Sequence, residues 1–184
     1  MRLPALEKNI LVYRALQMAL FLFHAEDIRR QLIGSVGRDV LKGTKKSLKG
    51  GTLLKAIFQR LVSERALTEA ESTELQELIE HRNQIAHHIH RLTGDIEIPG
   101  RKYNFQHYMK LQYDYDALKR VKRWRDILWR RLRANYVLVL SIDPLLFEAA
   151  EHAYEGELKS LKQRINRQYE SRRRKILGKA EQGH

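Results

Sequence analysis

The sequence contains no cysteine and no long uninterrupted hydrophobic run, and each absence excludes a class of protein. Without cysteine, the chain cannot form disulfides or thiolate metal sites. Its most apolar segment, Met18–Phe23, follows Arg14 and Gln17 and precedes Glu26 and Asp27, so it is too short to span a bilayer. The N-terminus also lacks the small-residue cleavage pattern of a signal peptide. We therefore predict a cytoplasmic protein with no membrane partner.

Acidic residues are scarce relative to basic ones. The chain has 22 Asp and Glu against 35 Lys and Arg, which gives a net charge of +13 and a pI near 10.1. This excess is more than solubility requires, so we predict a polyanionic partner, with RNA or DNA ahead of a membrane surface. The alternative is an acidic protein partner, such as an antitoxin or another regulatory protein.

The spacing of apolar residues and helix signals predicts an all-α protein. With 184 residues, of which 43% are hydrophobic, we expect a single-domain bundle of about five helices over residues 1–178 and a short basic and polar tail over 179–184. The expected helices are Pro4–Leu32, Thr52–Arg65, Thr68–Leu92, Asp116–Leu140 and a last one that starts at Asp143–Pro144. Residues 34–51 form a glycine-rich basic connection with at most a short helical turn. A small β-hairpin is a candidate near 95–105.

The helix over Thr68–Leu92 carries the most informative pattern. Thr68 and Glu71 form a capping box at its start. At about 100° per residue, its apolar positions gather into one stripe, which consists of Leu75, Leu78, Ile79, Ile85, Ala86, Ile89 and Leu92. Arg82 falls near the centre of this stripe. Because a guanidinium cannot be deprotonated there, it must be paired or solvated, and Glu26 or Asp27 is a candidate partner.

The segment from Arg82 to His88 resembles the motif of the HEPN family, which is an arginine followed four to six residues later by histidine on a bundle helix. The matching residues are Arg82, Asn83 and His87, and His88 also satisfies the spacing. The resemblance covers about twenty-five residues. It implies a helical bundle that dimerises around the motif, and many family members are metal-independent ribonucleases in toxin–antitoxin, phage-defence or RNA-processing systems. One toxin subgroup has a modified tyrosine two residues after the histidine, where this chain has Ile89.

The chemistry of RNA cleavage fits these residue types. RNA supplies its own nucleophile, the 2′-hydroxyl, so the protein must move two protons and neutralise charge at phosphorus. Histidine suits proton transfer near neutral pH, and the planar guanidinium suits phosphate. One Arg82/His87 pair supplies half of this set, so we expect a C2 homodimer that joins two pairs. Asn83 lies four residues before His87 and could orient its imidazole or a phosphate oxygen.

Each site residue also has a plainer interpretation. Arg82 could be only a buried ion-pair partner of Glu26 or Asp27, without a catalytic role. His87 could be an ordinary surface histidine, and His88 could be structural. A zinc site at His87 with His90, or at His81 with His88, lacks an HExxH pattern or thiolates. We therefore expect no metal and no cofactor.

Two basic segments are candidate RNA-binding surfaces. The first interleaves arginine and lysine with Trp124 and Trp129, which suits phosphate contact and base stacking unless the tryptophans pack inward. The second is a basic segment near the end of the chain, either helical or unstructured. The candidate residues are Lys119, Arg120, Lys122, Arg123, Arg130, Arg131, Arg172, Arg173 and Arg174.

Three functions are compatible with this sequence. The first is an endoribonuclease, used as a toxin or defence effector, with Arg82, Asn83 and His87 as catalytic residues. The second is a non-catalytic module that binds RNA or a nucleotide through Arg82. The third is an interaction protein whose basic surface binds an acidic partner. RNA cleavage in excess EDTA separates the first from the second.

Overall fold

The described part of the chain is built entirely of α-helices in the computed structural model, which describes residues 4–43, 48–87, 113–136 and 143–181. The helices are α1 (Ala5–Ser35), α2 (Gly37–Lys42), α3 (Gly50–Ser63), α4 (Glu69–His87), α6 (Ala117–Asn135) and α7 (Asp143–Glu181). The predicted all-α class is thereby confirmed. The predicted hairpin near 95–105 lies outside the described residues.

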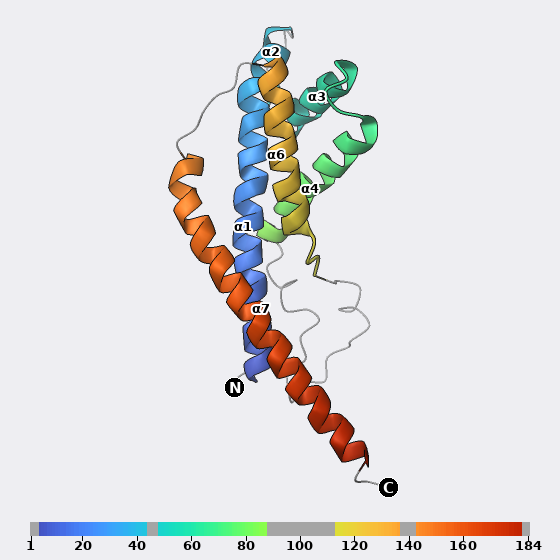
Figure 1. Ribbon diagram of the computed structural model, residues 1–184. Coiled ribbons are helices and arrows are strands. Elements are labelled where there is room, and N and C mark those ends of the chain that lie inside the picture. Colours follow the sequence, from blue (N-terminus) through green and yellow to red (C-terminus); the bar gives the residue numbers. More distant parts are fainter. Residues whose placement is uncertain (1–3, 44–47, 88–112, 137–142, 182–184) are drawn as a thin grey trace.

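Helix α1 is the central element of the bundle. It contacts every other described helix, and the long α7 crosses it diagonally and projects beyond its N-terminal end (Figure 1). The N-terminal part of α7 and helices α4 and α6 lie around α1, while α2 and α3 cluster at its C-terminal end (Figure 1). The arrangement places α4, which carries the HEPN-like motif, against the middle of α1.

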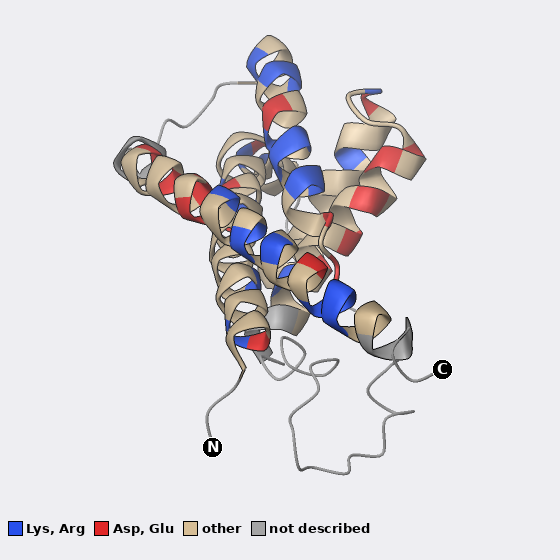
Figure 2. Ribbon diagram, turned by 60° about the horizontal axis from the view of Figure 1, so that its bottom comes forward, with Lys and Arg blue, Asp and Glu red and all other residues tan. Residues whose placement is uncertain are grey.

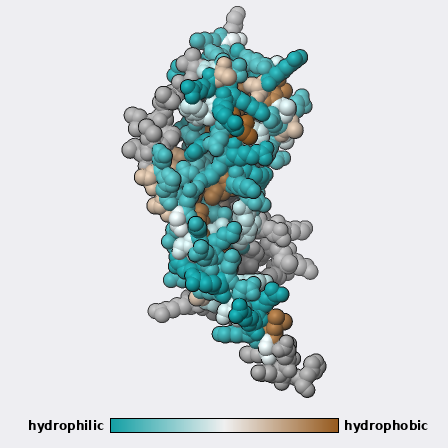
Figure 3. All heavy atoms as spheres, viewed as in Figure 1, coloured by the Kyte–Doolittle hydropathy of each residue, from teal (hydrophilic) through white to brown (hydrophobic). Residues whose placement is uncertain are grey.

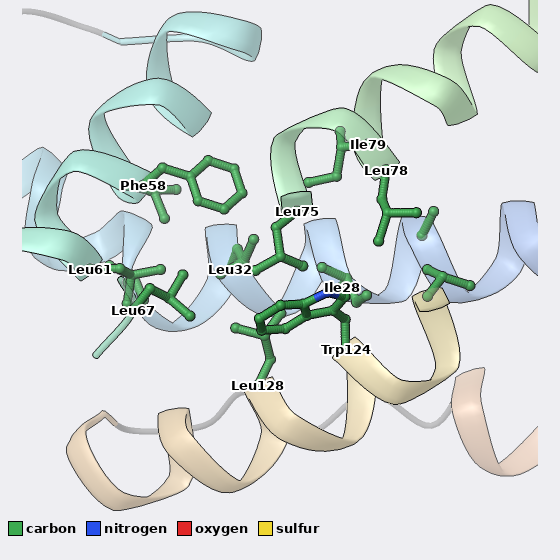
Figure 4. Close-up of a cluster of buried hydrophobic side chains, with 14 of the residues drawn as sticks. Ile28, Leu32, Phe58, Leu61, Leu67, Leu75, Leu78, Ile79, Trp124 and Leu128 are labelled. Atoms are coloured by element: carbon green, nitrogen blue, oxygen red, sulfur yellow. The ribbon is translucent and has the colours of Figure 1, made fainter. Parts of the chain in front are cut away.

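The hydrophobic core forms where α1, α3, α4 and α6 meet. Figure 4 shows Leu75 of α4 beside the Trp124 ring of α6, with Ile28 and Leu32 of α1 next to them. All four side chains are at most 1% exposed. Burial of apolar area at about 25 cal/mol per Å² stabilises this packing, so the core fixes the rotation of α4 about its axis. The apolar stripe predicted on α4 faces the core at Leu75, Leu78 and Ile79.

The start of α4 has the predicted capping box. The Thr68 amide donates to Glu71 Oε2 at 2.9 Å, and the Glu71 amide donates to Thr68 Oγ1 at 3.2 Å. Just before it, α3 ends at Ser63, and Arg65 lies in the left-handed region, at φ 58°. The next two amides donate back to the Leu61 carbonyl. These local bonds define the tight turn between α3 and α4.

Several predicted helix boundaries were wrong by a few residues. Helix α3 begins at Gly50 after Lys49, so Thr52 is inside the helix and is not its N-cap. Helix α6 ends at Asn135, before the predicted Leu140, because Tyr136 is extended and its hydroxyl bonds Glu64.

The glycine-rich connection contains more helix than expected. Helix α1 runs to Ser35, and α2 follows directly within the segment predicted to be irregular. Gly37 is buried there, and a Cβ at this position would lie 3.4 Å from Ile57 Cδ1. A Cβ would thus make an ordinary van der Waals contact with α3, so the space at this position does not require glycine.

The molecular surface is mostly hydrophilic. Figure 3 shows apolar atoms only in small separate groups on the face in view. None of the described helices combines the length and the apolar character needed to cross a bilayer.

Candidate functional site

Arg82 lies at the interface between α4 and α1, where it pairs with a carboxylate. Its Nη2 is 3.3 Å from Glu26 Oε2, and its side chain is 34% exposed. One turn earlier, Leu78 and Ile79 are buried, so the polar position follows the core directly. The partnership with Glu26, expected as one way to satisfy a charge within an apolar stripe, is confirmed. The Arg82 Nε is buried without a hydrogen-bond partner among the described residues, so the exposed third of the side chain does not include this atom.

Glu26 binds more than one guanidinium. Arg29 forms a bidentate pair with it, from Nε to Oε2 and from Nη2 to Oε1, both at 3.0 Å. Arg30 Nε lies 3.6 Å from Glu26 Oε1. Partial burial alone would raise the pKa of Glu26, but the bonds from Arg29 and the charges of Arg29, Arg82 and Arg30 lower it overall. The carboxylate is therefore ionised at neutral pH and holds three cations around it.

Asn83 connects Arg82 to a second carboxylate. Its Oδ1 accepts a hydrogen bond from Arg82 Nη1 at 3.0 Å, and its Nδ2 donates to Glu80 Oε2 at 3.4 Å. The amide thus uses both its acceptor and its donor within α4, and it fixes the orientation of the Arg82 guanidinium. Two of the three residues that carry the HEPN resemblance are therefore in direct contact.

The histidines of the motif are described only in part. His87 is the last residue of α4, so its backbone is helical, and it follows Arg82 by five residues. At 100° per residue, the two positions are about 140° apart around the helix. The His87 side chain and the whole of His88 lie outside the described residues. Two histidine pairs were considered for zinc, His87 with His90 and His81 with His88. In each pair at least one side chain lies outside the described residues.

A hollow of about 290 Å³ opens between α4 and the start of α6, and Arg82 is not part of its lining. Its lining includes Glu77 and Glu80 of α4 together with Asp114 and Arg120, which form an ion pair. Three carboxylates and one guanidinium give this hollow a negative balance, which disfavours phosphate. Arg82 is therefore a better site for an anion than this hollow.

The basic residues predicted on α6 fall into two groups. Three have carboxylate partners: Arg120 binds Asp114, Lys122 binds Glu151 and Glu155, and Arg131 forms a bidentate pair with Glu71. Lys119, Arg123 and Arg130 are exposed. The sequence identified the positive charges, but the pairing of Lys122 and Arg131 depends on α7 and α4, while Arg120 pairs locally with Asp114.

The two tryptophans of α6 have different environments. Trp124 is 1% exposed and belongs to the core, so the prediction that it could stack on a base is wrong. It follows Val121 and precedes Leu128 on the buried face of the helix, which is why its ring points inward. Trp129 is half-buried, and the Arg133 guanidinium lies 5.5 Å from its ring centroid. Only Trp129 retains accessible ring surface.

The C-terminal basic segment is helical. It continues α7 as far as Glu181, so the alternative of an unstructured tail is wrong for residues 172–181. Arg172 Nη1 donates to Glu7 Oε1 of α1 at 2.8 Å, whereas Arg173 and Arg174 are exposed. Figure 2 shows Lys and Arg along this part of α7 and acidic residues nearer its start.

Sequence reasoning missed a buried polar cluster between α1, α6 and α7. His24 is 0% exposed; its Nδ1 lies 3.0 Å from Arg125 Nη1, and its Nε2 lies 3.2 Å from Glu151 Oε1. Lys122 binds the same glutamate. The only sequence signal was a histidine at a core-facing position of α1, because its partners are about 100 residues away or more. This cluster attaches the first half of α7 to the bundle.

Together, the fold and the site define an all-α helical bundle with a guanidinium cluster at the α1–α4 interface. Comparison with models of known protein families, with curated proteins and with solved structures finds no match to this chain.

Proposed function

We propose that the protein is a metal-independent endoribonuclease of HEPN type, with Arg82, Asn83 and His87 as its catalytic residues. The observation that carries this proposal is the position of Arg82. A guanidinium directly after a buried apolar turn is oriented by Asn83 and Glu26, yet 34% of its side chain is exposed. The motif spacing to His87 adds an acid–base group on the same helix.

The reaction requires only these residue types and the RNA itself. A histidine accepts the 2′-hydroxyl proton, and the 2′-oxygen attacks phosphorus. The bond from phosphorus to the 5′-oxygen then breaks, and a second histidine donates a proton to the departing oxygen. Arg82 binds the phosphate oxygens, where negative charge gathers in the transition state. The products are a 2′,3′-cyclic phosphate and a 5′-hydroxyl.

The proposal includes a homodimer. A single helix places the Arg82 and His87 positions about 140° apart and supplies one histidine for two proton transfers. Two copies of the motif facing each other across a C2 axis supply two histidines and two arginines at one phosphate. Regulation by an antitoxin or another acidic protein would agree with the charge of +13. A toxin or defence effector is the role that follows from the family resemblance.

The first test is RNA cleavage by the purified protein in excess EDTA. We expect Arg82→Ala and His87→Ala each to lower the rate by about 10² to 10⁴, since each removes one electrostatic or acid–base contribution. His90→Ala is the matched control and should be much milder. A mixture of the two inactive variants should regain activity if the sites combine residues from both chains. Full activity of His87→Ala would contradict the assignment, and loss only in His88→Ala would move the role by one residue.

The alternative function is a non-catalytic module that binds RNA or a nucleotide. It is favoured by the ion pair between Arg82 and Glu26, because a phosphate clamp needs only an oriented guanidinium. In that case RNA binds with strong salt dependence, but no cleavage product forms in EDTA or in the presence of divalent metals.

A further inference from the structure

Helix α1 supplies two arginines that the HEPN-like motif does not include. Arg29 and Arg30 both reach Glu26, which is also the partner of Arg82 from α4. Three guanidiniums therefore surround a single carboxylate within 4.0 Å. The arrangement joins α1 to α4, and Arg82 lies more than 50 positions after Arg29 and Arg30 in the chain. Neither the spacing of the motif nor the charge of either helix alone predicts it.

The charge of this cluster is not balanced by its own carboxylate. Arg29, Arg30 and Arg82 carry three positive charges, and Glu26 carries one negative charge. Two more carboxylates lie nearby: Asp27 accepts from Gln31 and Glu80 accepts from Asn83, and both keep their negative charge because these donors are neutral amides. One arginine would suffice to satisfy Glu26, and additional like charges at this distance repel one another. The case for an added anion therefore rests on the exposed guanidinium donors of the cluster and not on an excess of positive charge.

The geometry also leaves the cluster accessible. The side chains of Arg29, Arg30 and Arg82 are 35%, 59% and 34% exposed. Arg29 uses two of its five N–H donors for the bidentate pair, and that pair holds the plane of its guanidinium. Planar guanidiniums with fixed orientation bind phosphate oxygens better than flexible cations do. Glu26 is thus a positioning residue for an anion site.

We propose that Arg29 and Arg30, oriented by Glu26, bind a phosphodiester of the RNA backbone next to the one that Arg82 contacts. The proposal rests on the proposed function for its ligand, RNA. It extends the site from one helix to two and assigns substrate-binding roles to α1 residues. Arg82 then binds the reacting phosphate and also lies at the edge of this second subsite, because it shares Glu26 with Arg29 and Arg30.

The test measures binding separately from cleavage. The probe is a fluorescent single-stranded 2′-O-methyl RNA oligonucleotide, which the proposed reaction cannot cut because its 2′-oxygens are blocked. Fluorescence anisotropy at several salt concentrations gives the affinity and its salt dependence. We expect Arg29→Gln and Arg30→Gln each to weaken binding several-fold and to reduce the slope of log K against log salt by about 0.7, the value for one phosphate contact on a single strand.

The matched control is Arg38→Gln on α2, which removes the same charge from an exposed position outside the cluster. We expect it to change affinity by less than twofold. Arg30 does not form a bidentate pair with Glu26 as Arg29 does, so Arg30→Gln should disturb folding less than Arg29→Gln. If Arg29→Gln is unstable, Arg30→Gln decides the result. If both cluster variants bind the probe as Arg38→Gln does, the inference is wrong. Polyglutamate serves as a second probe, which represents an acidic protein. If the cluster variants bind polyglutamate more weakly but bind RNA normally, the RNA subsite is wrong and an acidic protein is the better partner.

The two proposals fail in different ways. If wild type does not cut RNA in EDTA but the cluster variants still weaken binding, catalysis is disproved and the phosphate subsite stands. If wild type cuts RNA and the cluster variants bind normally, the subsite is disproved and the catalytic assignment stands.

Discussion

His24 shows how burial and charge act together on a single residue. The Arg125 guanidinium can only donate, so Nδ1 of His24 accepts and the neutral ring carries its proton on Nε2, toward Glu151. Burial and the charge of Arg125 lower the pKa of His24 to about 4, although Glu151 opposes the shift. The native protein therefore favours the neutral imidazole at this position.

This pKa predicts a dependence of stability on pH. The unfolded chain has a histidine pKa of about 6.5, so it binds a proton more readily than the native state between pH 6.5 and about 4. The contribution of the neutral His24 to the free energy of unfolding is fully present above pH 6.5 and is lost as the pH falls toward about 4. By pH 5 we expect the free energy of unfolding to fall by about 2 kcal/mol from this group. Urea unfolding at pH 7 and pH 5 measures the change.

His24→Gln should reduce that loss, and His152→Gln, at an exposed position of α7, is its control. A stability difference between pH 7 and pH 5 that is the same in wild type and His24→Gln would rule out the buried neutral histidine as its source.

Arg82 marks what residue-level reasoning could and could not predict. A permanent charge among apolar positions requires a partner, and the sequence named Glu26 among two candidates. It could not identify Arg29 and Arg30 as further partners of Glu26, because this depends on how α1 and α4 pack. Trp124 was ambiguous for the same reason, since a tryptophan among arginines fits a core or a base-stacking surface equally well until the neighbouring helices are placed.

At the scale of elements, the start of α4 was well predicted, while its predicted end at Leu92 lies outside the described residues. Its start follows from bonds within four residues, so Thr68 and Glu71 were sufficient to place it. The end of α6 was less predictable because Tyr136, the residue after it, makes a tertiary contact through its hydroxyl with Glu64. Arg131 also binds Glu71, and its bond together with that from the Thr68 amide lowers the pKa of Glu71 to about 2.

The capping box predicts a measurable loss of stability. Thr68→Ala removes the side-chain acceptor of the Glu71 amide, and we expect the free energy of unfolding to fall by about 1 kcal/mol. Thr73→Ala is the control, since Thr73 is exposed within α4 and bonds only the Glu69 carbonyl of the preceding turn. That change should stay within about 0.5 kcal/mol. Chemical denaturation of both variants checks the difference, and equal losses would show that the box contributes little.

At the scale of the whole molecule, α7 is divided by charge. Its first part, residues 143–158, contains five acidic and no basic residues, and residues 159–181 contain nine basic residues. The acidic part attaches to α6 through Lys122, which binds Glu151 and Glu155. The basic part crosses the N-terminal region of α1 and is fixed there by Asn9 with Gln168 and by Glu7 with Arg172. It then projects beyond the bundle (Figure 1).

This projecting helix should set RNA affinity rather than catalytic rate. Arg173 and Arg174 are exposed, so replacing both with alanine leaves the contact of Arg172 with Glu7 intact. We expect weaker RNA binding at moderate salt and a salt slope lower by about 1.4 for two lost phosphate contacts. Cleavage at saturating RNA should stay near that of wild type.

The double variant of Arg38 and Lys55, two exposed positions on α2 and α3, controls for net charge. If Arg173→Ala with Arg174→Ala leaves binding unchanged but lowers maximal turnover, the end of α7 belongs to the catalytic site.

The central claim is that this bundle cuts RNA by attack of the 2′-hydroxyl on a phosphate that Arg82 binds. The most direct measurement is the cleavage of an RNA oligonucleotide in excess EDTA, with a matched substrate that carries a 2′-deoxynucleotide on the 5′ side of the cut. We predict products that end in a 2′,3′-cyclic phosphate and a 5′-hydroxyl, no cut at the deoxynucleotide, and no products with Arg82→Ala. Cleavage that requires a divalent metal, or that proceeds equally at the deoxynucleotide, would contradict the claim.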